Sequence, residues 1–238
     1  MSINLPTQAF VLVGGKGKRL GNKVRFTPKP MLQIDEKPFL DYVLEWLFFN
    51  GIKKVVLLAG YLGEKILEYY KNNKLDLDIE IVIENKELGT GGAIFSSLEK
   101  AEDFFLVCNG DSICPFSFSE LDKVNSSIST VVLAKENNPQ RFGVVKHERG
   151  RVIKFEEKLS LKGVGSISTG VYLFQKEHFL KYSSSPSSLE LNFLPELVKK
   201  NQLGCIEVSG ELLDIGTPED LTKANKILKN HLSLYTTN

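Results

Sequence analysis

Runs of apolar residues alternate with stretches of helical period through the first half of the chain. Short runs rich in Val, Ile, Leu and Phe are typical of buried strands. We predict such strands at residues 9–13, 54–59, 79–83 and 104–108. Apolar residues three and four positions apart predict helices at 39–50, 63–71 and 92–100. This alternation indicates an α/β fold with a parallel, doubly wound sheet.

The second half has a different pattern, with more strands and fewer helices. Single strands are predicted at 130–134 and 167–174, a hairpin at 142–146 and 151–156, and short strands at 205–208 and 212–215. A helix is expected at 189–200, with Pro195 disturbing its pattern. Another helix is expected to start with Thr217 as its N-cap and Asp220 near the capping-box position. No repeat and no long linker is found, so the second half is predicted to form a lobe on the same sheet.

The first strand leads into the loop Gly14-Gly15-Lys16-Gly17-Lys18-Arg19-Leu20. Glycines let a backbone approach a ligand closely, and consecutive N–H groups can form an anion-binding concavity. Three cations in the same loop favour phosphate over the alternative, a solvated surface turn. The loop matches neither the dinucleotide fingerprint, since Leu20 stands where that pattern needs glycine, nor the Walker pattern, since Arg19 follows Lys18.

Further residues suited to phosphate chemistry follow the glycine loop. Lys29 lies between Pro28 and Pro30, which hold it in an extended segment. Asp111 ends a predicted strand, and Asp214 precedes Ile215-Gly216-Thr217-Pro218. Two such aspartates can share one Mg²⁺ with phosphate oxygens. The alternative is that each aspartate only caps a turn or helix.

Composition and charge exclude several classes of function. A net charge of +1 gives no global field for nucleic acid or an anionic membrane, so any anion site must be local. The three cysteines, Cys108, Cys114 and Cys205, show no metal spacing and fit reduced thiols in the cytoplasm. No apolar run reaches membrane-spanning length. The three histidines are scattered, which argues against histidine-based metal sites or catalytic triads.

In order along the chain, the motifs resemble the sugar-1-phosphate nucleotidyltransferases from about residue 9 to residue 228. The first loop and the proline-flanked Lys29 are the most specific part. The later motifs are Leu88-Gly89-Thr90-Gly91-Gly92-Ala93, Asn109-Gly110-Asp111, Phe155-Glu156-Glu157-Lys158, Thr169-Gly170-Val171-Tyr172 and Asp214-Ile215-Gly216-Thr217-Pro218. Lys18 departs from the family, which usually has Thr or Ser there, and its role stays open.

The resemblance implies a Rossmann-like nucleotidyltransferase fold with a mostly parallel central sheet and a small substrate lobe. Residues 1–238 would form one domain, with the nucleotide bound by about 1–112 and the sugar phosphate by about 113–238. The reaction implied is NTP plus sugar 1-phosphate giving NDP-sugar and pyrophosphate, with Mg²⁺ as cofactor.

The resemblance also implies roles for single residues. Arg19 and Lys29 would be catalytic, and Asp111 and Asp214 would bind the metal. The nucleotide would be bound by Gly14, Gly15, Gly17, Lys18, Glu84, Gly89 and Thr90. The sugar phosphate would be bound by Gly110, Gly143, Glu157, Lys158 and Thr169.

Glu84 is the residue that bears on the nucleobase. An ionised carboxylate only accepts hydrogen bonds, and guanine offers two adjacent N–H donors, so Glu84 favours GTP. A heptose 1-phosphate is the expected partner. Mannose 1-phosphate stays open, as do uridylyl, thymidylyl and cytidylyl transfer and a non-catalytic nucleotide-sugar sensor.

The sequence leaves two structural questions open. The aromatic run Trp46, Phe48 and Phe49 is assigned to the core rather than to an interface, although a homo-oligomer is compatible with the sequence. Whether residues 183–188, a serine-rich segment with Pro186, close over a substrate is not decided by the sequence.

Overall fold

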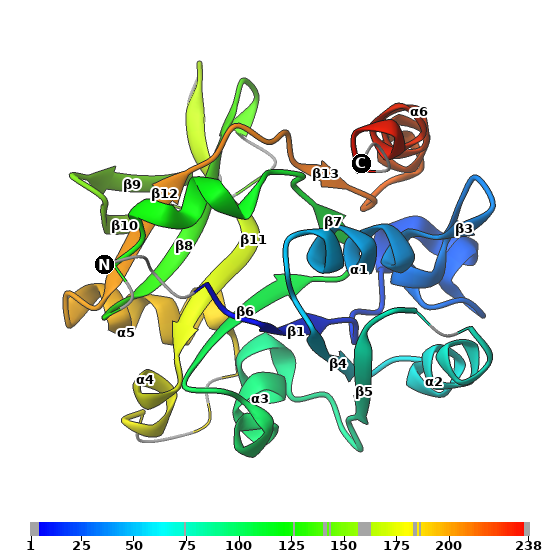
Figure 1. Cartoon of the computed structure of the whole chain (residues 1–238), viewed down its shortest axis with the longest axis horizontal. Coiled ribbons are helices and arrows are strands. Elements are labelled where there is room, and N and C mark those ends of the chain that lie inside the picture. Colours follow the sequence, from blue (N-terminus) through cyan, green and yellow to red (C-terminus); the bar gives the residue numbers. More distant parts are fainter. Residues whose placement is uncertain are drawn as a thin grey trace. The chain divides into compact units, whose positions relative to one another are not determined.

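A computed structural model describes residues 5–73, 75–125, 127–139, 142, 144–156, 163–182, 185 and 187–235, with the backbone alone at 156 and 229–235 (Figure 1). The chain forms two compact units. The first, here the glycine-loop unit, comprises Thr7–Glu87, Asn109–Ile113 and the chain from Leu213 onward. The second, here the hairpin unit, comprises the residues up to Pro6, Leu88–Cys108 and Cys114–Leu212. Each unit is therefore assembled from separate stretches of sequence.

Three parallel strands form the centre of the glycine-loop unit. They are β1 Gln8–Leu12, β4 Lys54–Ala59 and β5 Asp78–Ile83, in the order β5-β4-β1. The β1 and β4 strands pair from Gln8↔Lys54 to Leu12↔Leu58. Helices α1 Phe39–Phe49 and α2 Gly63–Asn72 lie in the connections between these strands (Figure 1). The predicted α/β class and the parallel pairing of these strands are confirmed.

Short elements complete the glycine-loop unit. The 3-10 helices are η1 Lys18–Val24 and η2 Lys29–Met31. Two small antiparallel ladders join β2 Gln33–Ile34 to β3 Lys37–Pro38 and β7 Ser112–Ile113 to β13 Leu213–Asp214. The last helix is α6 Pro218–Tyr235. Thr217 Oγ1 accepts from the Asp220 N–H at 3.2 Å, which confirms the predicted N-cap.

Helix α1 buries only part of its aromatic run. Trp46 is 2% exposed, whereas Phe48 is 40% and Phe49 is 49% exposed. The assignment of Phe48 and Phe49 to the core was therefore wrong. The buried stripe is set by Leu40, Val43, Leu44 and Leu47, and residues that follow at the helix end fall off that stripe.

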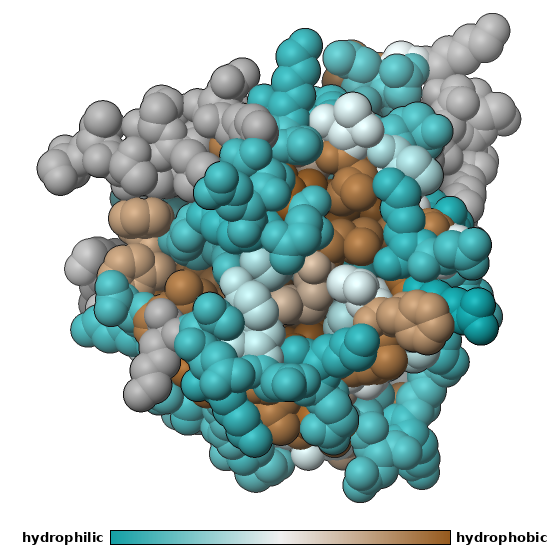
Figure 2. Space-filling view, turned by 90° about the vertical axis from the view of Figure 1, so that its right-hand side faces the viewer, coloured by the Kyte–Doolittle hydropathy of each residue, from teal (hydrophilic) through white to brown (hydrophobic). Residues whose placement is uncertain are grey.

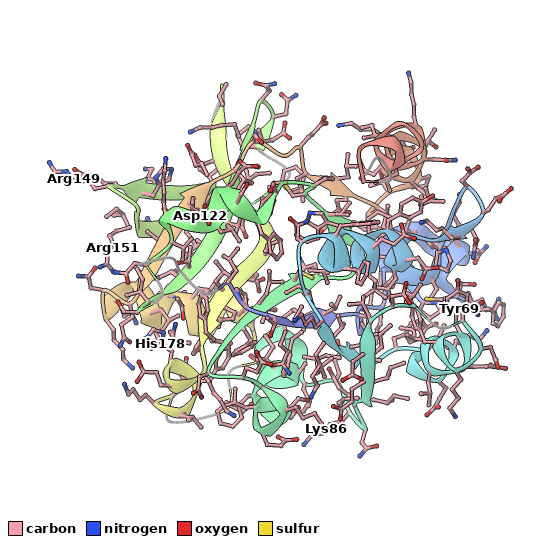
Figure 3. All side chains as sticks on the ribbon, in the orientation of Figure 1. Tyr69, Lys86, Asp122, Arg149, Arg151 and His178 are labelled. Atoms are coloured by element: carbon pink, nitrogen blue, oxygen red, sulfur yellow. The ribbon has the colours of Figure 1, made fainter. Side chains whose placement is uncertain are left out.

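A buried carboxylate links α1 to α2. Asp41, 6% exposed, accepts hydrogen bonds from the Tyr69 hydroxyl at 2.9 Å and the Tyr70 hydroxyl at 2.7 Å. Burial, with Asp41 as a second cause, raises the pKa of Tyr69 to about 12, so it donates at any physiological pH. Figure 3 labels Tyr69 on α2. The face of this unit that carries α2 shows hydrophilic side chains around hydrophobic areas (Figure 2).

The hairpin unit contains a mixed sheet. Its strands are β6 Phe104–Asn109, β8 Ser129–Glu136, β9 Val144–Glu148, β10 Arg151–Glu156, β11 Gly165–Gln175 and β12 Leu203–Glu207. Their order is β6-β11-β8-β12-β10-β9, with a further β11–β9 contact. Only β8 and β12 pair in parallel, and the other described pairs are antiparallel. Parallel pairing thus characterises the glycine-loop unit.

The predicted hairpin explains much of this antiparallel pairing. Strands β9 and β10 are joined by Arg149 and Gly150, whose φ angles are 48° and 74°. Positive φ at both positions suits the tight two-residue turns of hairpins. The Arg149 side chain points away from the strands (Figure 3).

The helical segments of this unit are short. They are α3 Gly89–Ser96, η3 Leu98–Lys100, η4 Phe118–Lys123, α4 Lys176–Leu180, the π-helix η6 Leu189–Phe193 and α5 Leu194–Lys199. The helix predicted at 92–100 instead begins at Gly89 and ends at Ser96, because the glycines at 89, 91 and 92 form its first turn.

Some sequence-based expectations fall outside the described residues. Residues 143, 157 and 158 are among them, as are 183, 184 and 186 of the serine-rich segment. Among the helices that the structure describes, none has the length and apolar character needed to cross a bilayer.

Candidate active site

The glycine loop leaves the end of β1 and meets the segments that follow β4 and β5. A Cβ on Gly14 would stand 3.1 Å from the Gly60 nitrogen and 3.7 Å from Glu84 Oε1. The Tyr61 N–H donates to the Gly14 carbonyl at 3.2 Å. A side chain here would therefore press against the Gly60 backbone, which would have to shift by a few tenths of an ångström. The loops at 14 and 110 also lie side by side within this unit, since the Gly110 N–H donates to the Leu12 carbonyl at 2.9 Å.

Gly17 makes room for Lys29. Its φ is 59°, in the left-handed region that glycine tolerates best. A Cβ here would stand 3.2 Å from Lys29 Cβ and 3.3 Å from Val24 Cγ1. The lysine stem therefore passes directly beneath the loop. No described atom lies within 4 Å of the corresponding point on Gly15, so the loop keeps an open side there.

Lys29 lies between the two predicted metal ligands. Its Nζ is 2.7 Å from Asp111 Oδ2 and 3.5 Å from Asp214 Oδ1. The Lys29 side chain is 6% exposed, against 33% for Asp111 and 27% for Asp214. A buried ammonium is stable only if it is paired. The structure thus brings together three residues that are 82 and 185 positions apart in sequence.

The ladder between β7 and β13 explains why the two aspartates are neighbours. Ser112 pairs with Asp214, and Ile113 pairs with Leu213. The Ile215 N–H then donates to the Asp111 carbonyl at 3.2 Å. These backbone contacts place both carboxylates at the same end of the two-residue ladder.

Arg19 extends from the glycine loop toward Gly216 and Asp214. A Cβ on Gly216 would stand 2.6 Å from Asp214 Oδ1 and 3.2 Å from Arg19 Nη2. The ends of both side chains therefore lie close to Gly216, and a side chain at this position would require them to shift. Arg19 is exposed, so its fork of donors can reach a phosphate.

Several groups act on the Asp214 carboxylate. Burial raises the pKa of Asp214 above its usual value; Lys29 opposes this shift and Asp111 adds to it. Among the described residues no cluster of three or more metal-binding side chains is found, so the metal role of Asp111 and Asp214 stays a prediction.

In the hairpin unit, Gly89 is constrained by packing. Its φ is 74°, and a Cβ would stand only 1.9 Å from the Ser187 carbonyl oxygen. Thr90 Oγ1 accepts from the Leu189 N–H at 2.9 Å and lies 3.4 Å from Glu190 Oε2. The hydroxyl of Thr90 therefore ties α3 to the π-helix, a role that the sequence did not reveal.

Thr169 lies in a bulge of β11, where the pairing with β8 shifts between Ser168 and Tyr172. Thr169 Oγ1 donates to the Val132 carbonyl at 3.0 Å, and the side chain is 2% exposed. Its role toward the sugar phosphate stays a prediction. Gly143, Glu157 and Lys158 lie outside the described residues.

Sequence reasoning missed two contacts near the glycine loop. Lys16 pairs with Glu87, which lies 71 positions away in the sequence. Gly60, opposite Gly14, has no motif of its own, and only the packing of β1 beside β4 identifies it. Lys86, next to Glu87, points outward beyond the end of β5 (Figure 3).

Comparison with known proteins identifies the family of this chain. A family model described as nucleotidyl transferase matches residues 8–231. A D-glycero-alpha-D-manno-heptose 1-phosphate guanylyltransferase of Campylobacter jejuni is 38% identical over 214 residues, which is 90% of this chain and 96% of the relative. The protein of the same name from Aneurinibacillus thermoaerophilus is 37% identical over 231 residues, or 94% and 100% of the two chains. The crystal structure of HddC from Yersinia pseudotuberculosis complexed with GMP-PN superposes with a TM-score of 0.83 at 30% identity, covering 93% of this chain and 99% of that one.

Replacing Gly89 by alanine should destabilise the protein. The new methyl group would collide with backbone rather than with a flexible side chain, so we expect a loss of roughly 1–3 kcal/mol. Gly15→Ala is the control, because its methyl group meets no described atom. Thermal unfolding of both variants checks this, and equal melting temperatures would contradict the packing constraint.

The two aspartates should respond differently to amidation. Asp214→Asn removes a charge that burial disfavours, so we expect the metal-free protein to be at least as stable as the parent at pH 7. Asp111→Asn removes the 2.7 Å ion pair of Lys29 and should cost roughly 1–3 kcal/mol. Because the pKa of Asp214 is raised in the folded state, this carboxyl takes up a proton at a higher pH in the folded protein than in the unfolded one. The stability difference between Asp214→Asn and the parent should therefore shrink as the pH falls. Melting curves across pH test both statements, and a large stability loss in Asp214→Asn at pH 7 would refute them.

Proposed function

Because this chain belongs to the nucleotidyl transferase family, we propose that it transfers the guanylyl group of GTP to D-glycero-α-D-manno-heptose 1-phosphate. The products are GDP-heptose and pyrophosphate. The alignments with this chain cover 96% and 100% of the two named guanylyltransferases, which supports the choice of guanine as base and heptose as sugar. The proposal places the enzyme in the cytoplasm, supplying activated heptose for surface polysaccharide.

The observation that carries the proposal is the position of Lys29 between Asp111 and Asp214, with Arg19 beside Asp214. Two carboxylates, a buried ammonium and an exposed guanidinium lie next to a glycine loop with an open side. A phosphoryl-transfer site needs these groups, because its main task is to bring two anions together and stabilise the charge that develops.

The donor set fits Mg²⁺. This ion prefers oxygen ligands and is usually bound by one or two carboxylates together with substrate phosphates. Asp111 and Asp214 would hold it. When bound, it would supply positive charge to the phosphate oxygens.

The reaction is an in-line displacement at the α-phosphorus of GTP. An oxygen of the sugar phosphate forms a bond to the α-phosphorus of GTP, and the bond from that phosphorus to the bridging oxygen of pyrophosphate breaks. The attacking group is already an anion, so no general base is required. Arg19 stabilises the departing pyrophosphate, and Lys29 neutralises charge at the reacting centre. Gly14, Gly15, Gly17 and Lys18 bind the nucleotide phosphates.

The remaining assignments complete the proposal. Gly89 and Thr90 line the nucleotide site, and Gly110, Gly143, Glu157, Lys158 and Thr169 contact the sugar phosphate. Glu84 reads the base, because its carboxylate can accept from the two adjacent N–H donors of guanine. Its Oε1 lies near Gly14, which places the carboxylate beside the phosphate loop.

A sensor without catalytic activity is the competing class. It would bind a nucleotide sugar but would need neither the metal carboxylates nor the buried lysine. The paired Lys29, Asp111 and Asp214 argue for catalysis, since a buried charge cluster is costly to keep without a use.

Pyrophosphate release with a panel of substrates tests the reaction. We expect pyrophosphate release to be fastest with GTP and the heptose 1-phosphate. Replacing GTP by ATP, CTP, UTP or dTTP, or replacing the heptose 1-phosphate by mannose or glucose 1-phosphate, should lower the rate. Arg19→Ala should lower kcat/KM by roughly 10²–10³, the usual effect of removing a donor to developing charge. Lys23→Ala, an exposed cation of the same segment, is the control. Nucleotide binding without turnover in any pair would favour the sensor.

Glu84→Gln should relax the choice of base. The amide loses one acceptor and presents donors to the donors of guanine, so we expect kcat/KM for GTP to fall about 10–100-fold. The value for UTP should change little or rise. Glu68→Gln, on the exposed face of α2, is the matched control. An unchanged ratio of GTP to UTP would show that backbone contacts select the base.

A further inference from the structure

The imidazole of His178 is buried on the short helix α4, in the hairpin unit. Figure 3 labels this residue, which is 4% exposed. Its Nδ1 lies 2.8 Å from Ser129 Oγ on β8, and Ser129 is 0% exposed. Neither residue has a part in the catalytic and binding assignments above. A buried titratable group outside the proposed active site therefore calls for an account of its own.

The hydrogen bonds of Ser129 decide which ring nitrogen carries the proton. The Gln175 N–H donates to Ser129 Oγ at 3.3 Å. A hydroxyl has one hydrogen to donate, and His178 Nδ1 is the acceptor that lies beside it in the described structure. Nδ1 therefore accepts this hydrogen bond, and the single proton of the neutral ring is on Nε2.

A second proton on the ring would break this arrangement. Both nitrogens of an imidazolium are donors, so Ser129 Oγ would have to accept from Nδ1 and from the Gln175 N–H together. The hydrogen of the Ser129 hydroxyl would then lose its acceptor at a fully buried position. A buried donor without a partner is costly. The closed fold is therefore compatible with the neutral ring of His178 and opposed to the charged one.

The charges around His178 do not reverse this preference. Burial, the largest effect, lowers the pKa of His178; Glu177 opposes the shift, whereas Lys181 and Lys200 add to it. Glu177 and Lys181 lie on or directly after α4 and are paired with each other at 2.7 Å, and Lys200 ends α5. The strands β8 and β11 contribute the uncharged hydroxyl and amide described above. Protonation of His178 thus favours a state in which α4 has left its place.

Aromatic packing carries this constraint from α4 to the π-helix η6. Phe179, the neighbour of His178, stacks on Phe193 of η6 with the ring centres 3.9 Å apart, and both residues are 0% exposed. At the other end of η6, the Leu189 N–H donates to Thr90 Oγ1 at 2.9 Å. Displacement of α4 would therefore remove a packing surface of η6 and loosen its contact with the first turn of α3.

We propose that His178 and Ser129 form a pH-sensitive latch that holds α4 and η6 in place while the imidazole is neutral. In the opened state His178 takes up a proton at a higher pH than in the closed state, because its pKa is lowered by burial. The closed state is therefore fully favoured above the ordinary histidine pKa of about 6.5 and loses stability as the pH falls below that value. The latch lies within the hairpin unit and does not depend on which substrates the protein uses.

Hydrogen exchange of the full chain at pH 8 and pH 5 tests the latch. Protection factors, corrected for the intrinsic pH dependence of amide exchange, should fall about tenfold or more in α4 and η6 at pH 5, as expected for one unsatisfied buried donor. His178→Asn should lose this pH dependence, because its amide oxygen can accept from Ser129 and does not titrate. His147→Asn is the matched control and should behave like the parent, since His147 is only half-buried and faces Glu207 at 3.2 Å.

A measurement on the parent protein tests the proposal even if His178→Asn fails to fold. Nitrogen-15 NMR should show His178 as the neutral Nε2–H tautomer at pH 7, and variants of the other two histidines assign its signals. An imidazolium or an Nδ1–H tautomer at pH 7 would overturn the proposal. So would unchanged protection of α4 and η6 in the parent at pH 5, or the same pH dependence in His178→Asn as in the parent.

Discussion

The ion pairs of Lys29 with Asp111 and Asp214 are the constraint on which the rest of the site depends. An ammonium that is 6% exposed is tolerated only next to opposite charge. The chain meets this requirement with a ladder of two residues, β7 with β13, which joins segments a hundred residues apart. Gly17 leaves room for the lysine stem, and Gly216 leaves room for Arg19 beside Asp214. Several sequence motifs therefore describe one arrangement of charges.

The glycines of the motifs occupy their positions for different physical reasons. Gly14 is needed because the backbone of Gly60 and the carboxylate of Glu84 lie close to it, and Gly110 because the end of β1 lies beside it. Gly15 faces open space, which fits a ligand-facing position. Gly89 is needed for packing against Ser187, whatever its role toward a nucleotide. A glycine in a phosphate-binding motif is therefore not by itself evidence of a ligand contact.

The charge of this protein is local rather than global. A net charge of +1 conceals a cluster in which Lys16, Lys18, Arg19 and Arg25 occupy one short stretch of chain. The opposing carboxylates arrive from Glu87, Asp111 and Asp214, which are distant in sequence. Exposed ion pairs are screened by solvent and buried pairs much less, so the buried pairs of Lys29 are electrostatically stronger than those of the exposed cations.

The sequence alone determined the α/β class, the strands of the glycine-loop unit, the hairpin and the cap at Thr217, because these depend on local period and residue type. Tertiary structure decided that Lys29 lies between the two aspartates and that Phe48 and Phe49 are exposed. It also decided that α3 begins at Gly89 and that Arg25 lines the same pocket as Lys16 and Lys18. These features arise from contacts between segments far apart in the chain or from the limits of a buried helix face, and local pattern carries no information about either.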